Sequence, residues 1–350
     1  MNREKGFSLG EIAKARPNLM GLATLWIALF HSLRLNFYQP WLLARPHLMD
    51  ILNRLREEGN CGVDIFLFLS GFGLVYSWMR LKERDPHPLR TFYRRRFSRV
   101  LPTMLAVFVL YYGIAGTRGT ADWLSKVFLY GQFSATLEGG NYWFFALLLA
   151  LYLLFPLIWK VVDRFGLPGT LGLIALAVLG PLAVKRFISE SYFIKTEILL
   201  TRIPVFILGV CFGKLARRDA RIPRWIPALA LVLALVTWYE IRLIPEDLLY
   251  LRRYAYAFLT LFIVLAHAWL SSLVSKKGPL YRAVTRIGAY SLELYLIYER
   301  LYLANPLGIH SPDAIGIIYA LTWFTAALLL SALLRSALRQ LGDREPSPVS

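Results

Sequence analysis

The sequence predicts an all-α fold, a polytopic membrane helix bundle of about ten transmembrane helices with both termini in the cytoplasm. Three observations lead to this prediction. Hydrophobic residues make up 57% of the 350 residues and charged residues only 18%, against about 45–50% and about 25% in soluble domains. The hydrophobic residues form runs too long for the core helices of a soluble protein. Lys and Arg, 40 in all, concentrate in alternate connections between these runs.

A transmembrane helix needs about 20 mostly hydrophobic residues. Ten segments meet this requirement, near residues 17–35, 62–79, 99–115, 142–160, 167–184, 199–213, 225–241, 254–273, 284–303 and 313–334. We therefore expect one transmembrane domain over residues 17–334, between a cytoplasmic segment at 1–16 and a cytoplasmic tail at 335–350. The longest connections are expected at 34–61 and 116–141. The amino-terminal segment is polar and lacks the cleavage site of a signal peptide, so we expect it to be retained.

Orientation follows from the basic residues, which favour the cytoplasmic side of a membrane. The two tails and the even-numbered connections carry 26 Lys and Arg, and the odd-numbered connections carry 14. The second connection alone holds eight. Both termini are therefore expected in the cytoplasm, in a multi-pass protein of the cell's inner membrane.

Composition also limits the partners. A formal net charge of +18 would suggest nucleic-acid binding in a soluble protein, but in a membrane protein it favours anionic lipid. We expect membrane lipid and no nucleic acid as partners. Cys61 and Cys211 are widely separated, so neither a disulfide framework nor a metal site is expected.

The first expected helix contains His31, in the run LMGLATLWIALFHSLRL. If the helix enters from the cytoplasm near Pro17, His31 lies about 21 Å into a hydrocarbon core about 30 Å thick. An ionisable side chain inside a membrane helix indicates a functional site, and a neutral imidazole can take a proton from an attacking hydroxyl. The alternative is a histidine near a helix end, bonded to a headgroup or a carbonyl.

The second expected helix begins with GNCGVDIFLFLSGFG, in which Asp64 lies near the boundary. The glycines of this segment, Gly62, Gly71 and Gly73, would allow close contact between helices. Asp64 either anchors the helix at the boundary or orients the imidazole of His31.

Before the third expected helix, the segment FYRRRFSRVLP brings together Arg95, Arg96 and Arg99. Arg95 and Arg99 are one helical turn apart, and such a cluster can bind phosphate on the cytoplasmic side. The alternative is simple anchoring by positive charge, which does not account for the aromatic residues between the arginines.

Three later residues are further candidates for the functional site, because of their positions and residue types. Trp143 begins the fourth helix, where a site role is favoured over an aromatic belt. Arg202 begins the sixth helix, and either lines a site or extends towards the interface. Glu293, deep in the ninth apolar run, either binds an acceptor hydroxyl or pairs with an arginine.

Six segments, in order along nearly the whole chain, resemble motifs of the acyltransferase 3 family of integral membrane acyltransferases. They are LMGLATLWIALFHS, GVDIFLFLSGF, FYRRRFSRVLP, NYWFFALLLALYLLFPL, TRIPVFILGVCFGKL and IGAYSLELYLIYE. The resemblance implies transfer of a short acyl group, commonly acetyl, from cytoplasmic acyl-CoA to a hydroxyl of a cell-surface glycan or glycolipid. It implies that His31 is catalytic and that Arg96 and Arg99 lie beside the donor. Acyl-CoA is then a substrate, and no permanently bound cofactor is expected.

The chain departs from the family pattern at several positions. Met20 stands where the family usually has an arginine, and Arg16, one turn earlier, is a candidate substitute. In the ninth helix, Leu292 replaces an aromatic residue and Tyr298 replaces a histidine; with Tyr295, Tyr298 is a candidate for substrate binding. Leu148 and Leu149 replace an acidic pair. These differences bear on the acceptor more than on the reaction class.

Two mechanisms remain open for His31, as a general base on the acceptor hydroxyl or as a transient carrier of the acyl group. The alternative function is a transporter or flippase of a lipid-linked sugar, because ten helices with buried polar residues also suit transport. Paired interrupted helices would favour transport, and the sequence suggests none.

Overall fold

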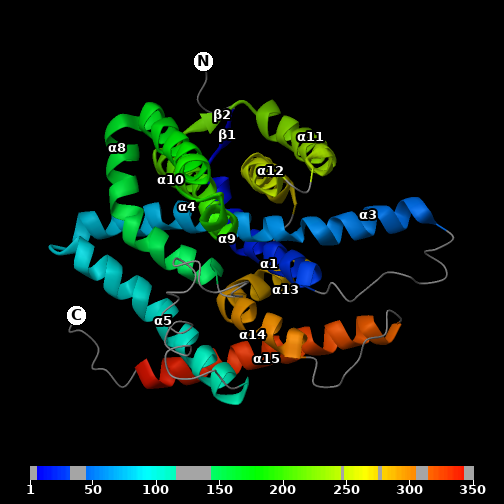
Figure 1. The fold of residues 1–350 in the computed structure, drawn as a ribbon. Helices are drawn as coiled ribbons and strands as arrows, with labels where there is room; N and C mark the ends of the chain where they lie inside the picture. Colours follow the sequence, from blue (N-terminus) through cyan, green and yellow to red (C-terminus); the bar gives the residue numbers. More distant parts are fainter. Residues whose placement is uncertain are drawn as a thin grey trace.

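The computed structural model describes residues 6–31, 45–115, 143–245, 248–274, 278–304 and 314–342. These residues are almost entirely helical (Figure 1). The α-helices are α1 (Glu11–His31), α3 (Pro46–Glu57), α4 (Cys61–Arg84), α5 (Pro88–Ala115), α8 (Trp143–Ala183), α9 (Glu190–Leu200), α10 (Ile203–Arg217), α11 (Trp225–Glu240), α12 (Leu249–Leu273), α13 (Pro279–Ala289), α14 (Ser291–Ala304) and α15 (Ala314–Gly342). The short turns are the 3₁₀ helices η2 (Glu58–Asn60) and η4 (Ile241–Leu243) and the π-helix η3 (Val184–Ile188).

One two-residue strand pair accompanies the helices. Strand β1 (Phe7–Ser8) pairs antiparallel with β2 (Arg221–Ile222), with Phe7 opposite Ile222. This contact ties the chain just before α1 to the connection between α10 and α11, so the ends of these helices are held together.

Within the described ranges, six helical segments are long and apolar enough to cross a membrane. They are Pro46–Arg84, Trp143–Ile188, Glu190–Arg217, Trp225–Leu243, Leu249–Leu273 and Leu321–Leu338. Large apolar side chains are exposed on α8, α11 and α15; Leu176, for example, is 68% exposed and Leu333 66%. Because a membrane supplies an apolar surrounding, these faces suit contact with lipid. The all-α membrane fold is confirmed, while the count of ten and the orientation stay predictions.

The helix α4 lies at the centre of the bundle, and 15 of its 24 residues are buried. It runs across the middle of Figure 1, with α10 and α12 on one side, α5, α14 and α15 on the other, and α8 passing from one side to the other. Its contact with α10 is close because both helices present glycine there. A Cβ on Gly71 would meet the carbonyl of Phe206, and a Cβ on Gly209 would meet the carbonyl of Phe68. The expected close packing of the second helix is therefore confirmed.

Helix α8 covers two expected spans, 142–160 and 167–184. Gly166 separates them with φ 59° and ψ −132°, a conformation that glycine adopts at little cost. The Nζ of Lys214 donates to the carbonyls of Val162 (2.7 Å) and Asp163 (2.8 Å). A lysine thus caps the carbonyl end of the first half.

Two expected boundaries were wrong. The connection predicted at 34–61 contains α3. This helix was not predicted because its sequence is polar and contains no hydrophobic run. The span predicted at 284–303 is two helices, α13 and α14, separated at Tyr290 (φ −101°, ψ 12°). The span predicted at 199–213 falls within the apolar segment Glu190–Arg217, in which a turn at Thr201 and Arg202 separates α9 from α10.

Candidate active site

Helix α1 carries the two groups around which the site is built. Arg16 lies in its second turn, and His31 is its last residue. Fifteen residues of α-helix separate their Cα atoms by about 22 Å. Each side chain lines a different cavity, so one helix connects the two ends of the site.

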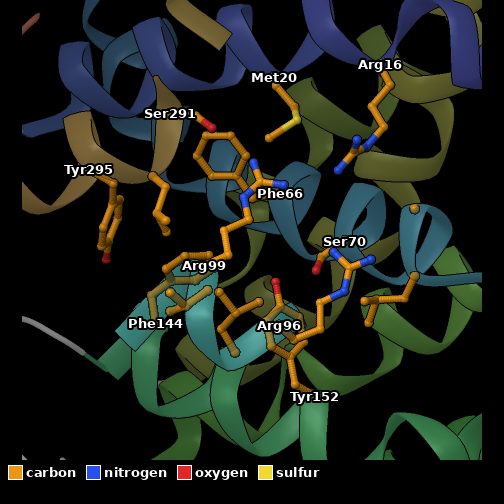
Figure 2. Close-up of a pocket in the computed structure, with 15 residues that line it drawn as sticks. Arg16, Met20, Phe66, Ser70, Arg96, Arg99, Phe144, Tyr152, Ser291 and Tyr295 are labelled. Carbon is orange, nitrogen blue, oxygen red and sulfur yellow. The ribbon is translucent and has the colours of Figure 1, made fainter. Parts of the chain in front are cut away.

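The first cavity, the arginine cavity, has a volume of about 260 Å³. Its walls come from α1, α4, α5, α8 and α14 (Figure 2). It is lined by Arg16, Met20, Phe66, Ser70, Gly73, Leu74, Arg96, Arg99, Val100, Phe144, Leu148, Tyr152, Ser291, Leu292 and Tyr295. Figure 2 shows Arg16 extending into it from one side and Arg96 and Arg99 from the other.

The arginine cavity is electropositive. Among the described residues, no carboxylate lies within salt-bridge distance of Arg16, Arg96 or Arg99. The Nε of Arg16 donates to the carbonyl of Leu69 at 3.2 Å, and its guanidinium lies against Gly73, where a Cβ would be 3.1 Å from Cζ. The Nε of Arg96 is buried with no hydrogen-bond partner.

Burial lowers the pKa of both Arg16 and Arg96, and the charge of Arg99 lowers each further. These shifts mean that the charged guanidinium groups lose hydration and repel one another. A bound anion would offset both costs. The cavity is therefore suited to a phosphate or another multiply charged anion.

The other walls of the arginine cavity are largely apolar. They include three positions at which the sequence departs from the family pattern, Met20, Leu148 and Leu292. Arg16 occupies the cavity in place of an arginine at position 20, as its spacing of one turn suggested. The apolar walls lead to Tyr295, on α14.

The second cavity, the His31 cavity, has a volume of about 480 Å³. It is lined by Ile27, Phe30, His31, Glu57, Asn60, Val63, Trp143, Ile198, Leu249, Arg252, Arg253, Tyr256 and Tyr295. The Nδ1 of His31 lies 2.9 Å from the carbonyl oxygen of Ile27. A carbonyl only accepts, so Nδ1 carries the proton and the Nε2 of the neutral ring is the basic nitrogen.

Tyr295 lines both cavities and, with Phe66, separates them. The remaining space at this partition is about 10 Å³, lined in part by His31, Phe66, Tyr295 and Tyr298. The ring of Tyr295 packs against those of Phe144 and Phe145, at centroid distances of 5.0 and 5.7 Å. The arginines and His31 thus approach one partition from opposite sides.

Asp64 forms a fully buried salt bridge with Arg202, with Oδ2 and Nη1 2.6 Å apart. Arg202 Nη2 also donates to Oδ1 of Asn60 at 2.9 Å, and its guanidinium lies 4.9 Å from the centre of the Trp143 ring. Arg202 lines neither cavity, and it does not extend to the membrane interface because it is fully buried. Its guanidinium instead contacts the Trp143 ring. In the described part of the chain Asp64 has no hydrogen bond to His31. No direct contact therefore supports the predicted role of Asp64 in orienting the imidazole.

The other predicted residues are distributed as follows. Glu293 is buried and forms a bidentate pair with Arg335 of α15, with atoms 2.8 and 2.5 Å apart; the second of the two expected roles, pairing with an arginine, is the one observed. Tyr298 packs edge-on against Phe324 at 5.6 Å. Arg95 is exposed and does not line the arginine cavity.

Sequence reasoning missed the start of α12. Arg252, Arg253 and Tyr256 all line the His31 cavity. The signal was present in the segment YLRRYAY, which places two adjacent arginines and several tyrosines at an expected helix boundary. Only the fold brings this segment to His31, which is more than 200 residues away in the chain.

Comparison with known proteins supplies an independent result. The sequence matches the acyltransferase 3 family, described as an acyltransferase domain, over residues 19–337. The acyltransferase MdmB of Streptomyces mycarofaciens is 30% identical over 127 residues, which is 36% of this chain and 27% of that protein. The aligned part thus spans about a quarter of that relative's length. No solved structure matches the chain.

Proposed function

Because this chain belongs to the acyltransferase 3 family of membrane acyltransferases, we propose that it transfers a short acyl group, acetyl in the first instance, from cytoplasmic acyl-CoA to a hydroxyl of a glycan or lipid-linked sugar. The observation that carries the proposal is the pair of cavities that meet at Tyr295. One presents three arginines and the other presents a histidine.

The arginine cavity is proposed to hold the donor. The phosphates of CoA would lie against Arg16, Arg96 and Arg99, which have no carboxylate partner in the described ranges. The apolar walls that lead from the arginines towards Tyr295 suit the uncharged arm that ends in the thioester. The count of basic residues supports a cytoplasmic position for this cavity.

His31 is proposed to act on the acceptor. Its Nε2 takes the proton of the acceptor hydroxyl, whose oxygen attacks the thioester carbonyl. The carbon–sulfur bond then breaks, CoA leaves as a thiolate that takes up the proton from His31, and an ester remains on the acceptor. A transient acyl-histidine would divide the same transfer into two steps. In both routes the thioester and His31 must come into contact, and Tyr295 lies between the two cavities that hold them.

Replacing His31 with Gln tests this proposal. Transfer of radiolabelled acetyl from acetyl-CoA to a membrane glycolipid extract should fall at least about 100-fold, the loss typical for a general base. Acetyl-CoA binding should persist. The matched control is His267→Gln, since His267 is also a helix histidine but hydrogen-bonds Ser271 and lines neither cavity. Near wild-type transfer by a well-folded His31→Gln protein would refute the role of His31.

The acyl group and the acceptor can be identified together. Mass spectrometry of cell-envelope glycans from a deletion strain and its parent should reveal glycans that lack an acyl substituent. The missing mass would identify the group and the glycan that carries it. Identical glycan profiles would contradict a glycan acceptor.

A further inference from the structure

We propose that the His31 cavity binds an acceptor sugar that carries an acidic group, a phosphate or a carboxylate, next to the ring that bears the accepting hydroxyl. This inference rests on the proposed function, because it assigns the His31 cavity to the acceptor. It adds the chemical class of the acceptor and the residue that recognises it, Arg252.

The basic side of the cavity is formed by Arg252 and Arg253 in the first turn of α12. Arg253 Nη1 already pairs with Oε1 of Glu197 at 2.6 Å. No carboxylate of the described chain lies within salt-bridge distance of Arg252, whose Nε donates to the carbonyl of Ile241 at 3.4 Å. Arg252 is therefore the charge available to a ligand.

The position of these arginines makes an anion more favourable still. The N-terminal turn of a helix carries partial positive charge, which stabilises anions and opposes cations. Arg252, the fourth residue of α12, thus adds to a potential that is already positive, whereas the charge of Arg253 is balanced by Glu197. A negatively charged ligand would relieve this repulsion.

The nearby carboxylates already have partners. Glu57 lies 3.5 Å from Nη2 of Arg56 and is largely exposed. Glu58 accepts a hydrogen bond from the hydroxyl of Tyr256 at 2.6 Å. Neither forms a salt bridge with Arg252 in this structure.

Aromatic side chains form another part of the cavity surface. Trp143 and Tyr256 line the same cavity as Arg252 and His31. The buried Arg202 guanidinium lies over the Trp143 ring, which fixes the indole against the cavity wall. Aromatic rings of this kind contact ligands that are apolar on one face and polar at the edge, as a sugar ring is. His31 and Arg252 would then contact the hydroxyl and the acidic group of one ligand.

The test measures binding of three probes to the full chain in lipid nanodiscs. The probes are dodecyl glucoside, which is neutral, dodecyl glucuronide, which carries a carboxylate, and polyprenyl phosphate glucose. The wild-type protein should bind at least one acidic probe about tenfold or more tightly than the neutral glucoside, the effect of one charge-assisted contact. The acidic probe that binds more tightly distinguishes carboxylate from phosphate.

Arg252→Gln should reduce this preference to about one and leave the affinity for dodecyl glucoside unchanged. Arg252→Lys should retain most of it. Arg242→Gln is the matched control, because Arg242 is exposed, lies over the Tyr239 ring and does not line the cavity; the preference should survive there.

Equal wild-type affinity for all three probes would overturn the inference, even if Arg252→Gln failed to fold. An unchanged preference in folded Arg252→Gln would also overturn it. Acetyl-CoA binding and acetyl transfer are measured on the same samples. Transfer without acidic preference contradicts this inference alone, whereas acidic preference without transfer to any acceptor contradicts the proposed reaction.

Discussion

Arg96 and Arg99 line the arginine cavity, whereas Arg95, next to Arg96 on α5, does not. Because all three carry the same charge, this difference allows an experiment to separate the proposed donor binding from membrane anchoring. The family resemblance implied Arg96 and Arg99, but helical spacing alone could not make the distinction. Arg95 and Arg99 are one turn apart, and the pairing of Arg96 with Arg99 depends on which face of α5 meets α4 and α8.

Replacing Arg96 and Arg99 with Gln should weaken acetyl-CoA binding by about 10- to 100-fold per arginine, the effect of one hydrogen bond to a charged group. Isothermal titration of the purified proteins measures this. Arg95→Gln removes an equal charge from the same turn and should bind acetyl-CoA normally. Equal losses in all three variants would indicate a general electrostatic effect rather than a binding site.

Some side chains of the site could be predicted and others could not. His31 stood out because it is ionisable within an apolar run, and Arg16 because it lies one turn from Met20 on the same helix. The partner of Asp64 could not be predicted, since Arg202 is 138 residues away. Periodicity shows which face of a helix is apolar but not which helix packs against it.

At the scale of elements, the close contact between α4 and α10 fixes the centre of the bundle. It holds Asp64 on α4 beside Arg202 at the start of α10. Apolar runs predicted most of these helices, and glycines predicted the close contact. The break before α10 and the break between α13 and α14 were not predicted, because hydrophobic residues continue through both.

Gly209→Ala should destabilise the protein by about 1–3 kcal/mol or more, since the added methyl would meet the backbone carbonyl of Phe68, and a packed core tolerates extra volume poorly. Gly172→Ala is the control. Its added methyl would meet nothing within 4 Å, and Ala favours a helix over Gly by about 0.5–1 kcal/mol. Thermal unfolding in nanodiscs compares the two. An unfolding temperature for Gly209→Ala equal to that of Gly172→Ala would mean that the α4–α10 contact does not limit stability.

At the scale of the whole molecule, the function depends on orientation. The arginine cavity must open to the cytoplasm if acyl-CoA is the donor. The first half of α5 contains five of the eight basic residues of the second connection, and the end of α4 contains the other three, in agreement with the rule that places basic residues on that side.

Reporter fusions at both ends of the chain should therefore report a cytoplasmic location. Alkaline phosphatase should be inactive at both termini and active when fused within residues 116–141, which are predicted to face outwards. An active phosphatase at either terminus would reverse the orientation and remove the basis for a cytoplasmic donor.

The partition at Tyr295 and Phe66 has an electrical consequence. Cavities that opened to both sides and joined would form a conducting path, and each elementary charge crossing a potential of 100 mV dissipates about 2.3 kcal/mol. The space left at the partition, about 10 Å³, is at the lower limit for a single water molecule, about 10–15 Å³. In this structure the space holds no more than about one water molecule. If the proposed transfer takes place at this partition, we expect it to proceed without opening a water path for protons between the two sides of the membrane.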